Sequence, residues 1–279
     1  MLVHEHVMVD FIGADQIRLG RYDRDEVFRT AEPKLKELRA RGCRRMLECT
    51  PNYLGRDPEL LKRLSDGLDF EIWSNTGLYG AGNHKYLPGY ARTETASQLA
   101  KRWVAETRES WRPRFIKIGV NRSPLNELDR KLVQAAAITS RETGLTIASH
   151  TGDGAAAMEQ LGIVNAERVS PARFVWVHAQ NEGDHAIHEK IARAGAWVEF
   201  DGIGPKSIPF HLECVRFLAQ KGLSNRMLIS QDSGWYHVGE PGGGDFRRYT
   251  LLYTRFLPQL EPTQVPRLMW DNPRAAFGA

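Results

Sequence analysis

Six residues with side chains suited to metal binding or proton transfer stand at the ends of short apolar segments of the sequence. They are four histidines, one lysine and one aspartate: His4, His6, Lys117, His150, His178 and Asp232. Imidazole nitrogens and carboxylate oxygens are ligands of borderline divalent metals such as zinc. If these side chains converge in space, the sequence therefore predicts a metal centre.

Each residue taken alone also has a structural interpretation. A single strand histidine is more often hydrogen bonded in a protein core than bound to metal. Burying a lone ammonium group is costly, so Lys117 could instead form a buried salt bridge with Glu48 or Asp232. Asp232 could also cap the turn that follows it. The metal interpretation therefore depends on the joint pattern.

Short apolar segments rich in strand-forming residues alternate with longer amphipathic segments along the whole chain. We expect strands at 2–9, 45–50, 70–79, 115–120, 145–151, 174–179, 196–202 and 227–232. We expect helices at 24–41, 57–68, 94–109, 127–143, 154–161, 185–194, 209–221 and 246–257. This alternation predicts an α/β fold, a single (β/α)8 TIM barrel with its chemistry at the C-terminal ends of the strands. A doubly wound open sheet is the alternative, but no nucleotide-binding glycine motif opens the first helix.

The two-residue period of a strand predicts which of these side chains face the barrel interior. Ile116, Ile118 and Val120 share the face that would pack against helices, so Lys117 is predicted to point inward. The histidines are predicted to lie opposite their apolar neighbours: His150 to Leu145 and Ile147, His178 to Val175 and Val177, and His4 and His6 to Val3, Glu5 and Val7. Other histidines lie away from the strand ends and are expected on the surface or in loops: His84, His185, His188 and His211.

Composition and charge exclude several classes of protein. The 279 residues carry 38 Lys and Arg against 34 Asp and Glu, a net charge of +4 that is too small and dispersed for a nucleic-acid binder. Three cysteines without a C-x-x-C pair favour a reducing compartment. No apolar stretch approaches the roughly 18 residues of a membrane helix, and the N-terminus lacks a secretory signal. We therefore expect one cytoplasmic domain over residues 1–279, with no nucleic-acid or membrane partner.

Several short motifs together resemble the phosphotriesterase family of the amidohydrolase superfamily, which includes the phosphotriesterase-like lactonases. The motifs are H-E-H at 4–6, F-I-K-I-G at 115–119, A-S-H-T at 148–151, V-H-A-Q at 177–180 and S-Q-D-S-G-W at 230–235. The resemblance extends from His4 to the W-D-N-P-R segment at 270–274, which is nearly the whole chain.

The resemblance implies a site with two divalent metal ions, expected to be zinc, with cobalt, manganese or iron as alternatives. The implied ligands are His4, His6 and Asp232 for the more buried ion, His150 and His178 for the more exposed one, and an N-carboxylated Lys117 as the bridge. A hydroxide between the metals would be the nucleophile, and Asp232 would orient it and accept its proton.

The resemblance also suggests substrate contacts. Tyr79 stands where the lactonase branch has a tyrosine that touches the substrate, although it could simply be a rim aromatic. The same branch commonly has an arginine after the aspartate of the seventh strand, where this chain has Gly202. Lys206 could supply a substitute cation or could be a solvated loop lysine. Trp235 and His237 could form a leaving-group pocket or pack across the barrel mouth.

The predicted function is a metal-dependent hydrolase that attacks a lactone or related ester, with organophosphate triester hydrolysis as a side activity. One alternative within this class is a hydrolase of phosphorylated or otherwise charged lactones. An alternative from another class is a non-catalytic barrel that binds a small molecule. In that case Lys117 should be salt-bridged to an acid. Relatives are often homodimers, so a homodimer is expected by analogy.

Overall fold

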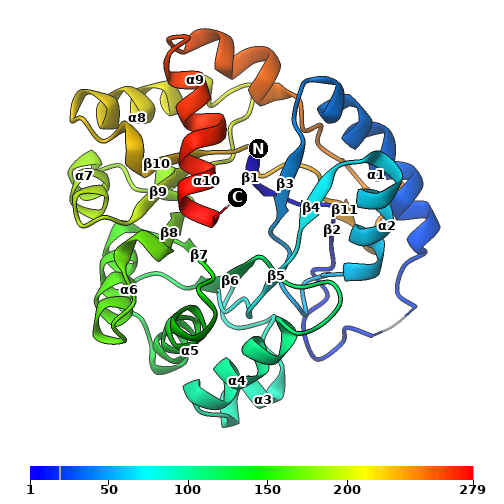
Figure 1. The fold of residues 1–279 in the computed structure, drawn as a ribbon. Helices are drawn as coiled ribbons and strands as arrows, with labels where there is room; N and C mark the ends of the chain where they lie inside the picture. Colours follow the sequence, from blue (N-terminus) through cyan, green and yellow to red (C-terminus); the bar gives the residue numbers. More distant parts are fainter. Residues whose placement is uncertain (19, 279) are drawn as a thin grey trace.

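Strands and helices alternate along the whole chain (Figure 1). The structure, a computed structural model, describes residues 1–18 and 20–278. The strands of the central wall are β1 (Leu2–Glu5), β3 (Arg45–Glu48), β4 (Glu71–Trp73), β5 (Asn75–Thr76), β6 (Phe115–Val120), β7 (Ile147–Thr151), β8 (Phe174–Val177), β9 (Trp197–Phe200) and β10 (Met227–Ile229). Two further short strands, β2 (Met8–Val9) and β11 (Tyr236–His237), pair with each other.

The wall strands form a closed parallel barrel. β1, β3 and β4 pair in one run, and β5 to β10 pair in order in a second run. Only Ser74 separates β4 from β5, so these two strands together take the place of the predicted third strand. The ring closes where the segment after β10 meets β1, with the amide of Asp232 donating to the carbonyl of His4 over 3.1 Å. The predicted (β/α)8 barrel is therefore confirmed, and the open-sheet alternative is wrong.

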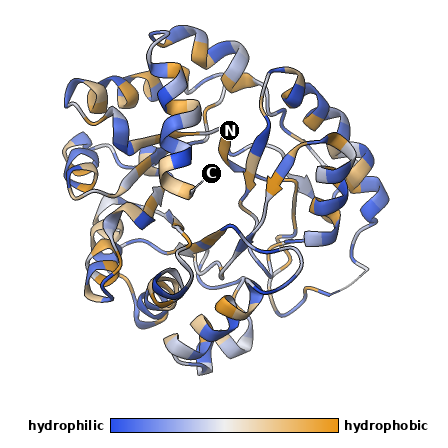
Figure 2. Cartoon of the chain, viewed as in Figure 1, coloured by the Kyte–Doolittle hydropathy of each residue, from blue (hydrophilic) through white to orange (hydrophobic). Residues whose placement is uncertain are grey.

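Helices surround this wall, and Figure 2 shows that they combine hydrophobic and hydrophilic residues. They are α1 (Arg24–Ala40), α2 (Pro58–Leu68), α3 (Gly89–Thr93), α4 (Ala96–Glu106), α5 (Glu127–Thr143), α6 (Gly154–Ala166), α7 (His185–Arg193), α8 (Ile208–Gln220), α9 (Gln264–Pro266) and α10 (Asn272–Phe277). Local sequence explains several of their ends. Asp57 caps α2 by accepting from the amide of Leu60 over 3.1 Å, with Pro58 at the first helical position. Gly144 ends α5 in a left-handed conformation with φ of 79°.

Two hydrophobic clusters hold the barrel together. The larger lies between the wall and the helices, and the smaller fills the barrel interior with residues from most strands, including Val3, Phe115, Val175 and Leu228. The C-terminal helix α10 closes one end of the barrel beside the N-terminus (Figure 1). Phe277 belongs to the interior cluster, and its ring lies 5.9 Å from that of Phe115.

One predicted helix differs from the structure. The helix expected over 246–257 is wrong at its start, because the backbone of Arg247 instead pairs with Gly234 through hydrogen bonds of 2.8 and 3.0 Å. This pairing ties the loop after β10 to the following segment, and helical structure begins only near Leu252–Phe256. Among the described residues, no helix is both long and apolar enough to cross a membrane.

Candidate metal centre

A cavity of about 290 Å³ opens at the carboxyl ends of the barrel strands. Its lining includes all six residues that the sequence suggested as metal ligands. Two sets of its side chains have ligand atoms close enough to share one ion: His4 with His6 and Asp232, and His4 with His178 and Asp201. The fold therefore brings together residues that are up to 228 positions apart in the sequence, from His4 to Asp232.

Regular strand alternation places Lys117 and His150. Lys117 lies in β6, and its neighbours Ile116 and Ile118 belong to the cluster between the wall and the helices. Lys117 consequently points into the barrel, as predicted. On β7, Ile147 likewise packs outward and His150 lines the cavity.

An irregularity in β1 places His4. The predicted arrangement, with Val3 on the face opposite His4, is wrong, because Val3 packs inside the barrel while His4 lines the cavity. The register of β1 against β3 shifts between Leu2 and Glu5, so three steps along β1 match two along β3. A β-bulge of this kind re-aims a side chain, and it allows both Val3 and His4 to face inward.

Left-handed backbone conformations place the last two predicted ligands. The predicted outward packing of Val175 and Val177 is wrong, since both valines lie in the interior cluster. His178 reaches the cavity because it follows β8 with φ of 64°, and Asp232 follows β10 with φ of 51°. Few residues with a Cβ atom adopt this conformation, although Asp and His do so more readily than most, and strained positions of this kind concentrate at functional sites.

Each of the four cavity histidines has its Nδ1 atom in a hydrogen bond. Nδ1 lies near Glu199 (2.9 Å) and Asp201 (3.1 Å) for His4, near Thr50 (2.8 Å) for His6, near Tyr79 (3.0 Å) for His150 and near Asp201 (2.5 Å) for His178. Carboxylates only accept hydrogen bonds, so Nδ1 carries the proton in His4 and His178. This leaves Nε2 as the free nitrogen, as in histidines that bind metal while a second group orients the ring.

Two buried polar atoms in the cavity have no hydrogen-bond partner among residues 1–18 and 20–278. They are Nζ of Lys117 and Oδ1 of Asp232. The predicted alternative of a salt bridge between Lys117 and Glu48 or Asp232 is therefore wrong. Oδ1 of Asp232 lies 3.1 Å from Nε2 of His6 and 3.8 Å from Nε2 of His4. Converging ligand atoms without partners are what a polar site built around a cation presents, so this donor set fits divalent metal.

Burial sets the protonation states of these groups. It lowers the pKa of His4 to about 4, with the charge of Lys117 acting in the same direction, and it also lowers the pKa values of His6 and His150. These imidazoles are consequently neutral at pH 7, which is the form that binds metal. Burial alone would raise the pKa of Asp232, but the adjacent imidazoles of His6 and His4 bring it below its ordinary value. Asp232 is therefore an ionised carboxylate.

The sequence analysis missed a second set of residues that orient the ligands. Asp201, which directly follows β9, is fully buried and accepts from both His4 and His178. Burial opposes its ionisation, but these two rings hold its pKa well below the usual range. Thr50 accepts from His6 and donates to Glu48 over 2.5 Å. Applying the strand-end rule to the seventh predicted strand would have identified Asp201.

The predicted substrate contacts divide into two groups. Tyr79 and Trp235 line the cavity, and the Trp235 ring lies 4.4 Å from that of His6. His237 does not line the cavity, although its ring stacks 6.0 Å from Trp235. Lys206 is exposed in the loop before α8 and does not line the cavity. Phe11, which the sequence analysis did not single out, does line the cavity and stacks on Trp235 at 5.6 Å.

Two histidines expected on the surface or in loops are buried in helices, so that expectation is wrong for them. His188 of α7 donates from Nε2 to the carbonyl of Ala179 over 2.7 Å. His211 of α8 donates from Nε2 to the carbonyl of Asp201 over 2.6 Å. Both rings therefore hold the backbone directly at or beside the cavity residues His178 and Asp201.

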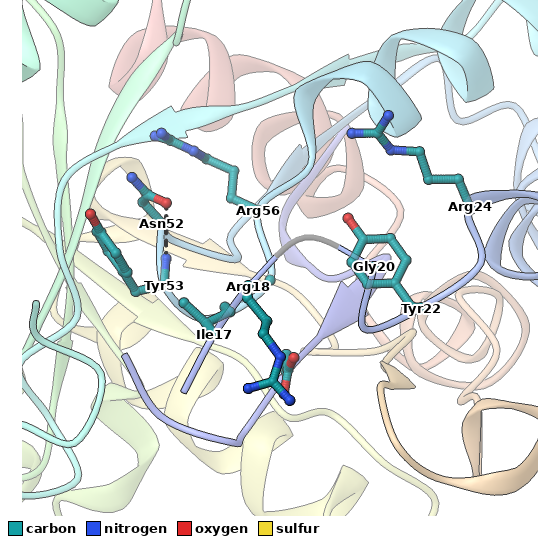
Figure 3. Close-up of a pocket in the computed structure, with 10 residues that line it drawn as sticks. Ile17, Arg18, Gly20, Tyr22, Arg24, Asn52, Tyr53 and Arg56 are labelled. Carbon is teal, nitrogen blue, oxygen red and sulfur yellow. Dashed lines mark hydrogen bonds between the residues drawn. The ribbon is translucent and has the colours of Figure 1, made fainter. Parts of the chain in front are cut away.

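A second cavity, of about 530 Å³, lies beside the loop that follows β3 (Figure 3). Figure 3 shows Tyr22 and Tyr53 on opposite sides of it. Two of its arginines are held in ion pairs: Arg24 with Asp57, and Arg56 with Glu106. None of the six predicted ligands lines this cavity, so the candidate site remains the one at the strand ends.

Known proteins are similar to this chain in sequence and in fold. The sequence profile of the Phosphotriesterase family matches residues 1–277. A phosphotriesterase homology protein from Escherichia coli is 27% identical, with 99% of this chain and 97% of that protein covered. An aryldialkylphosphatase from Saccharolobus solfataricus is 25% identical over 83% of this chain and 76% of its own length.

A solved structure extends the comparison to the fold. A mutant of a phosphotriesterase-like lactonase from Deinococcus radiodurans superposes with a TM-score of 0.88 at 27% identity, covering 99% of this chain and 95% of the other. The barrel, the strand-end cavity and the match over almost the entire sequence lead to one assignment. This chain belongs to the phosphotriesterase family and is a hydrolase that acts on ester bonds.

Proposed function

We propose that the strand-end cavity holds two divalent metal ions, expected to be zinc, and hydrolyses a lactone or related ester. His4, His6 and Asp232 would hold one ion, His150 and His178 would hold the other, and an N-carboxylated Lys117 would be a ligand of both; all six residues line the cavity. Cobalt, manganese and iron are the alternative metals. The observation that carries the proposal is that all four rings are fixed through Nδ1, so that four Nε2 atoms remain as ligands beside Asp232 and Lys117.

The surroundings of Lys117 support its carboxylation. An ammonium group buried without a partner is destabilising, and a cation cannot ligate a metal. Reaction of the neutral amine with carbon dioxide forms an N–C bond and releases one proton, which leaves a carbamate whose single negative charge is shared by two oxygens. The modification therefore turns a buried positive charge into a bridging ligand.

The chain's own residues would orient the reactants and move the proton. The ions, when bound, supply Lewis acidity to the substrate's carbonyl or phosphoryl oxygen and lower the pKa of water. Asp232 is ionised and has Oδ1 free of hydrogen-bond donors, so this atom accepts the proton of the attacking water. Asp201 keeps the rings of His4 and His178 in place. Phe11 and Trp235 provide an apolar wall for the leaving group.

The charge of the lining supports a neutral substrate. Apart from the histidines, the only basic side chain among the described lining residues is Lys117, which the proposal converts to an anion. Gly202 supplies no cation, and Lys206 lies outside the cavity. The alternative of a phosphorylated lactone therefore has no arginine or further lysine among the described lining residues to pair with its phosphate. Neutral lactones and, as a side activity, organophosphate triesters fit the cavity better.

We further propose that residues 1–279 act as one domain. A homodimer and a cytoplasmic location remain predictions, and light scattering would test the former.

Metal analysis combined with a substrate panel tests the proposal. We expect about two equivalents of metal per chain, and loss of activity on chelation. Lys117→Ala and Asp232→Asn should each reduce activity by more than about a hundredfold, because several kcal/mol of transition-state stabilisation depend on the metals. Lys62→Ala, on the exposed face of α2, is the matched lysine control. Protein with far less than two metals whose activity survives chelators would overturn the proposal. Turnover confined to phosphorylated lactones would favour the charged-lactone alternative.

A further inference from the structure

The glutamate between the first two cavity histidines binds the segment that carries Asp232. Glu5 is fully buried, with 0% of its surface exposed. Its carboxylate accepts three hydrogen bonds: from the Ser230 hydroxyl (2.8 Å), the Gln231 amide (3.2 Å) and the Ser233 amide (2.7 Å). All three donors belong to the four residues after β10, and they flank Asp232 on both sides. One side chain therefore forms hydrogen bonds with the backbone before and after Asp232.

Asp232 needs such support because of its backbone conformation. Its φ of 51° lies in the left-handed region, which is strained for a residue with a Cβ atom. The Asp232 amide donates to the carbonyl of His4 over 3.1 Å, which fixes one end of the peptide. The adjoining amides of Gln231 and Ser233 both point at Glu5. If that acceptor is removed, buried amides lose their partner and the constraint on this conformation is relaxed.

Hydrogen bonds that do not involve Glu5 hold the segment around Asp232 against the chain that follows it. The side chain of Gln231 donates to the carbonyl of Tyr249 over 2.6 Å and accepts from the amide of Leu252 over 2.7 Å. The Tyr249 hydroxyl donates to the carbonyl of His6 over 2.6 Å. These bonds fix how the segment lies against the following chain. Only the Glu5 carboxylate, among the described side chains, bonds to amides on both sides of Asp232.

We propose that Glu5 is a positioning residue, which sets the Asp232 carboxylate against His4 and His6 without itself contacting substrate. The inference rests on the proposed function, since it concerns the same metal centre. Glu5 does not line the cavity, so any effect of its replacement must pass through the residues that it holds. The atoms affected are Oδ1 of Asp232 and Nε2 of His6, now 3.1 Å apart.

A double-mutant cycle on zinc affinity tests this role. The zinc dissociation constant would be measured by competition with a chelator for the wild type, Glu5→Gln, Asp232→Asn and the double variant. Glutamine keeps the size of the side chain but replaces one acceptor oxygen by an NH2 group, so it cannot accept from all three donors. We expect Glu5→Gln to weaken zinc binding about tenfold to a hundredfold, the usual effect of removing a group that orients a ligand. In the Asp232→Asn background the same change should have no further effect, because Glu5 acts through Asp232.

Controls separate this role from general stability. Asp129→Asn removes a buried carboxylate that pairs with His84 outside the cavity, and it should leave zinc affinity and kcat unchanged even if it lowers the melting temperature. Ser230→Ala removes one of the three donors, and should give a smaller change than Glu5→Gln. It also serves as the test if Glu5→Gln fails to fold. In the kinetics, Glu5→Gln should lower kcat with little change in KM.

The outcomes distinguish this inference from the proposed function. Wild-type protein that binds no zinc and hydrolyses no lactone would overturn the proposed function, and the inference with it. If the wild type binds zinc and Glu5→Gln binds it equally well, only the inference fails. Effects of Glu5→Gln and Asp232→Asn that simply multiply in the double variant would likewise overturn it, because they would show that Glu5 acts independently of Asp232.

Discussion

The phenol oxygen of Tyr79 lies 3.0 Å from Nδ1 of His150. If Nε2 of His150 is to bind metal, Nδ1 must carry the proton, and the phenol oxygen must accept it. The hydrogen of the Tyr79 hydroxyl is then free to point into the cavity. Burial and the nearby charge of Asp232 raise the pKa of Tyr79, so this hydroxyl stays protonated. One residue would thereby orient a proposed metal ligand and offer a hydrogen-bond donor to the substrate.

Tyr79→Phe separates these two contributions from simple packing. Phenylalanine keeps the ring that packs against Gly119 but removes the oxygen that fixes His150. We expect activity to fall about tenfold to a hundredfold, with weaker zinc retention, because the ring of His150 loses its orienting partner. Metal content and kcat on a neutral lactone would be measured together. Tyr86→Phe, at a neighbouring ring 5.9 Å away, is a matched control that should change neither quantity. A Tyr79→Phe variant with unchanged metal content and kcat would contradict this role.

The sequence predicts the barrel because its strands and helices alternate regularly, and the same regularity places two of the six candidate ligands. Lys117 and His150 lie on strands whose alternation is unbroken, so a two-residue period places them correctly. His4 and His178 also reach the cavity, but through a bulge and a left-handed residue that alternation does not describe. Their position at a strand end predicts both histidines as site residues, whereas the predicted orientation of the neighbouring valines is wrong. Irregular backbone is set by tertiary contacts, which local patterns do not contain.

The residues that orient the ligands were harder to predict than the ligands. Glu5 and Glu48 are buried acids within strand segments, and they have partners far away in the sequence, such as Ser233 for Glu5. His211 reaches the Asp201 carbonyl from a helix, where a single histidine carries no recognisable pattern. Only Asp201 stood at a predicted strand end. The rest required knowledge of which segments meet at the barrel mouth.

We expect the protein to retain its metal at pH values low enough to protonate histidines of ordinary pKa. Burial lowers the pKa of His4 to about 4 from an ordinary value of 6.5, and it also lowers those of His6 and His150. A lowered pKa means that the neutral, metal-binding form survives as the pH falls, and that protonation expels the metal only near the lower value. Zinc release would be followed with a chromogenic chelator from pH 7 downward. A release midpoint near 6.5 would contradict the expectation.

The carboxylate of Asp57 should stabilise the fold when it is ionised. Its carboxylate accepts from the Leu60 amide, from the Tyr22 hydroxyl over 2.5 Å and from Nε of Arg24 over 2.6 Å. Burial alone would raise its pKa, but these hydrogen bonds lower it below the ordinary 3.8. The stabilisation is therefore complete above that value and is lost as the pH falls through the folded-state pKa. Asp57→Asn should reduce the unfolding free energy by about 1–3 kcal/mol at pH 7.

Urea unfolding of the wild type and Asp57→Asn at pH 7 and pH 3 would measure this contribution. The difference between the two proteins should shrink at pH 3, because protonation removes the charge that the variant already lacks. Asp66→Asn, at an exposed acid of the same helix that pairs with Lys62, should change stability by less than about 0.5 kcal/mol. An Asp57→Asn effect of equal size at both pH values would show that the charge is not what stabilises α2.

Gly202 is a position at which the preference for substrate charge could be changed. It lines the cavity with φ of 65°, and a Cβ atom there would meet only Nε2 of Gln180, at 3.4 Å. Gly202→Arg should place a cation in a cavity for which we propose neutral substrates, so KM for a lactone bearing a carboxylate should fall relative to that for its neutral analogue. Gly202→Ala imposes the same left-handed conformation on a residue with a Cβ atom, and both variants should lose about 1 kcal/mol of stability. Because alanine brings the strain without the charge, a similar shift in the KM ratio with both variants would assign the effect to the backbone and refute the electrostatic explanation.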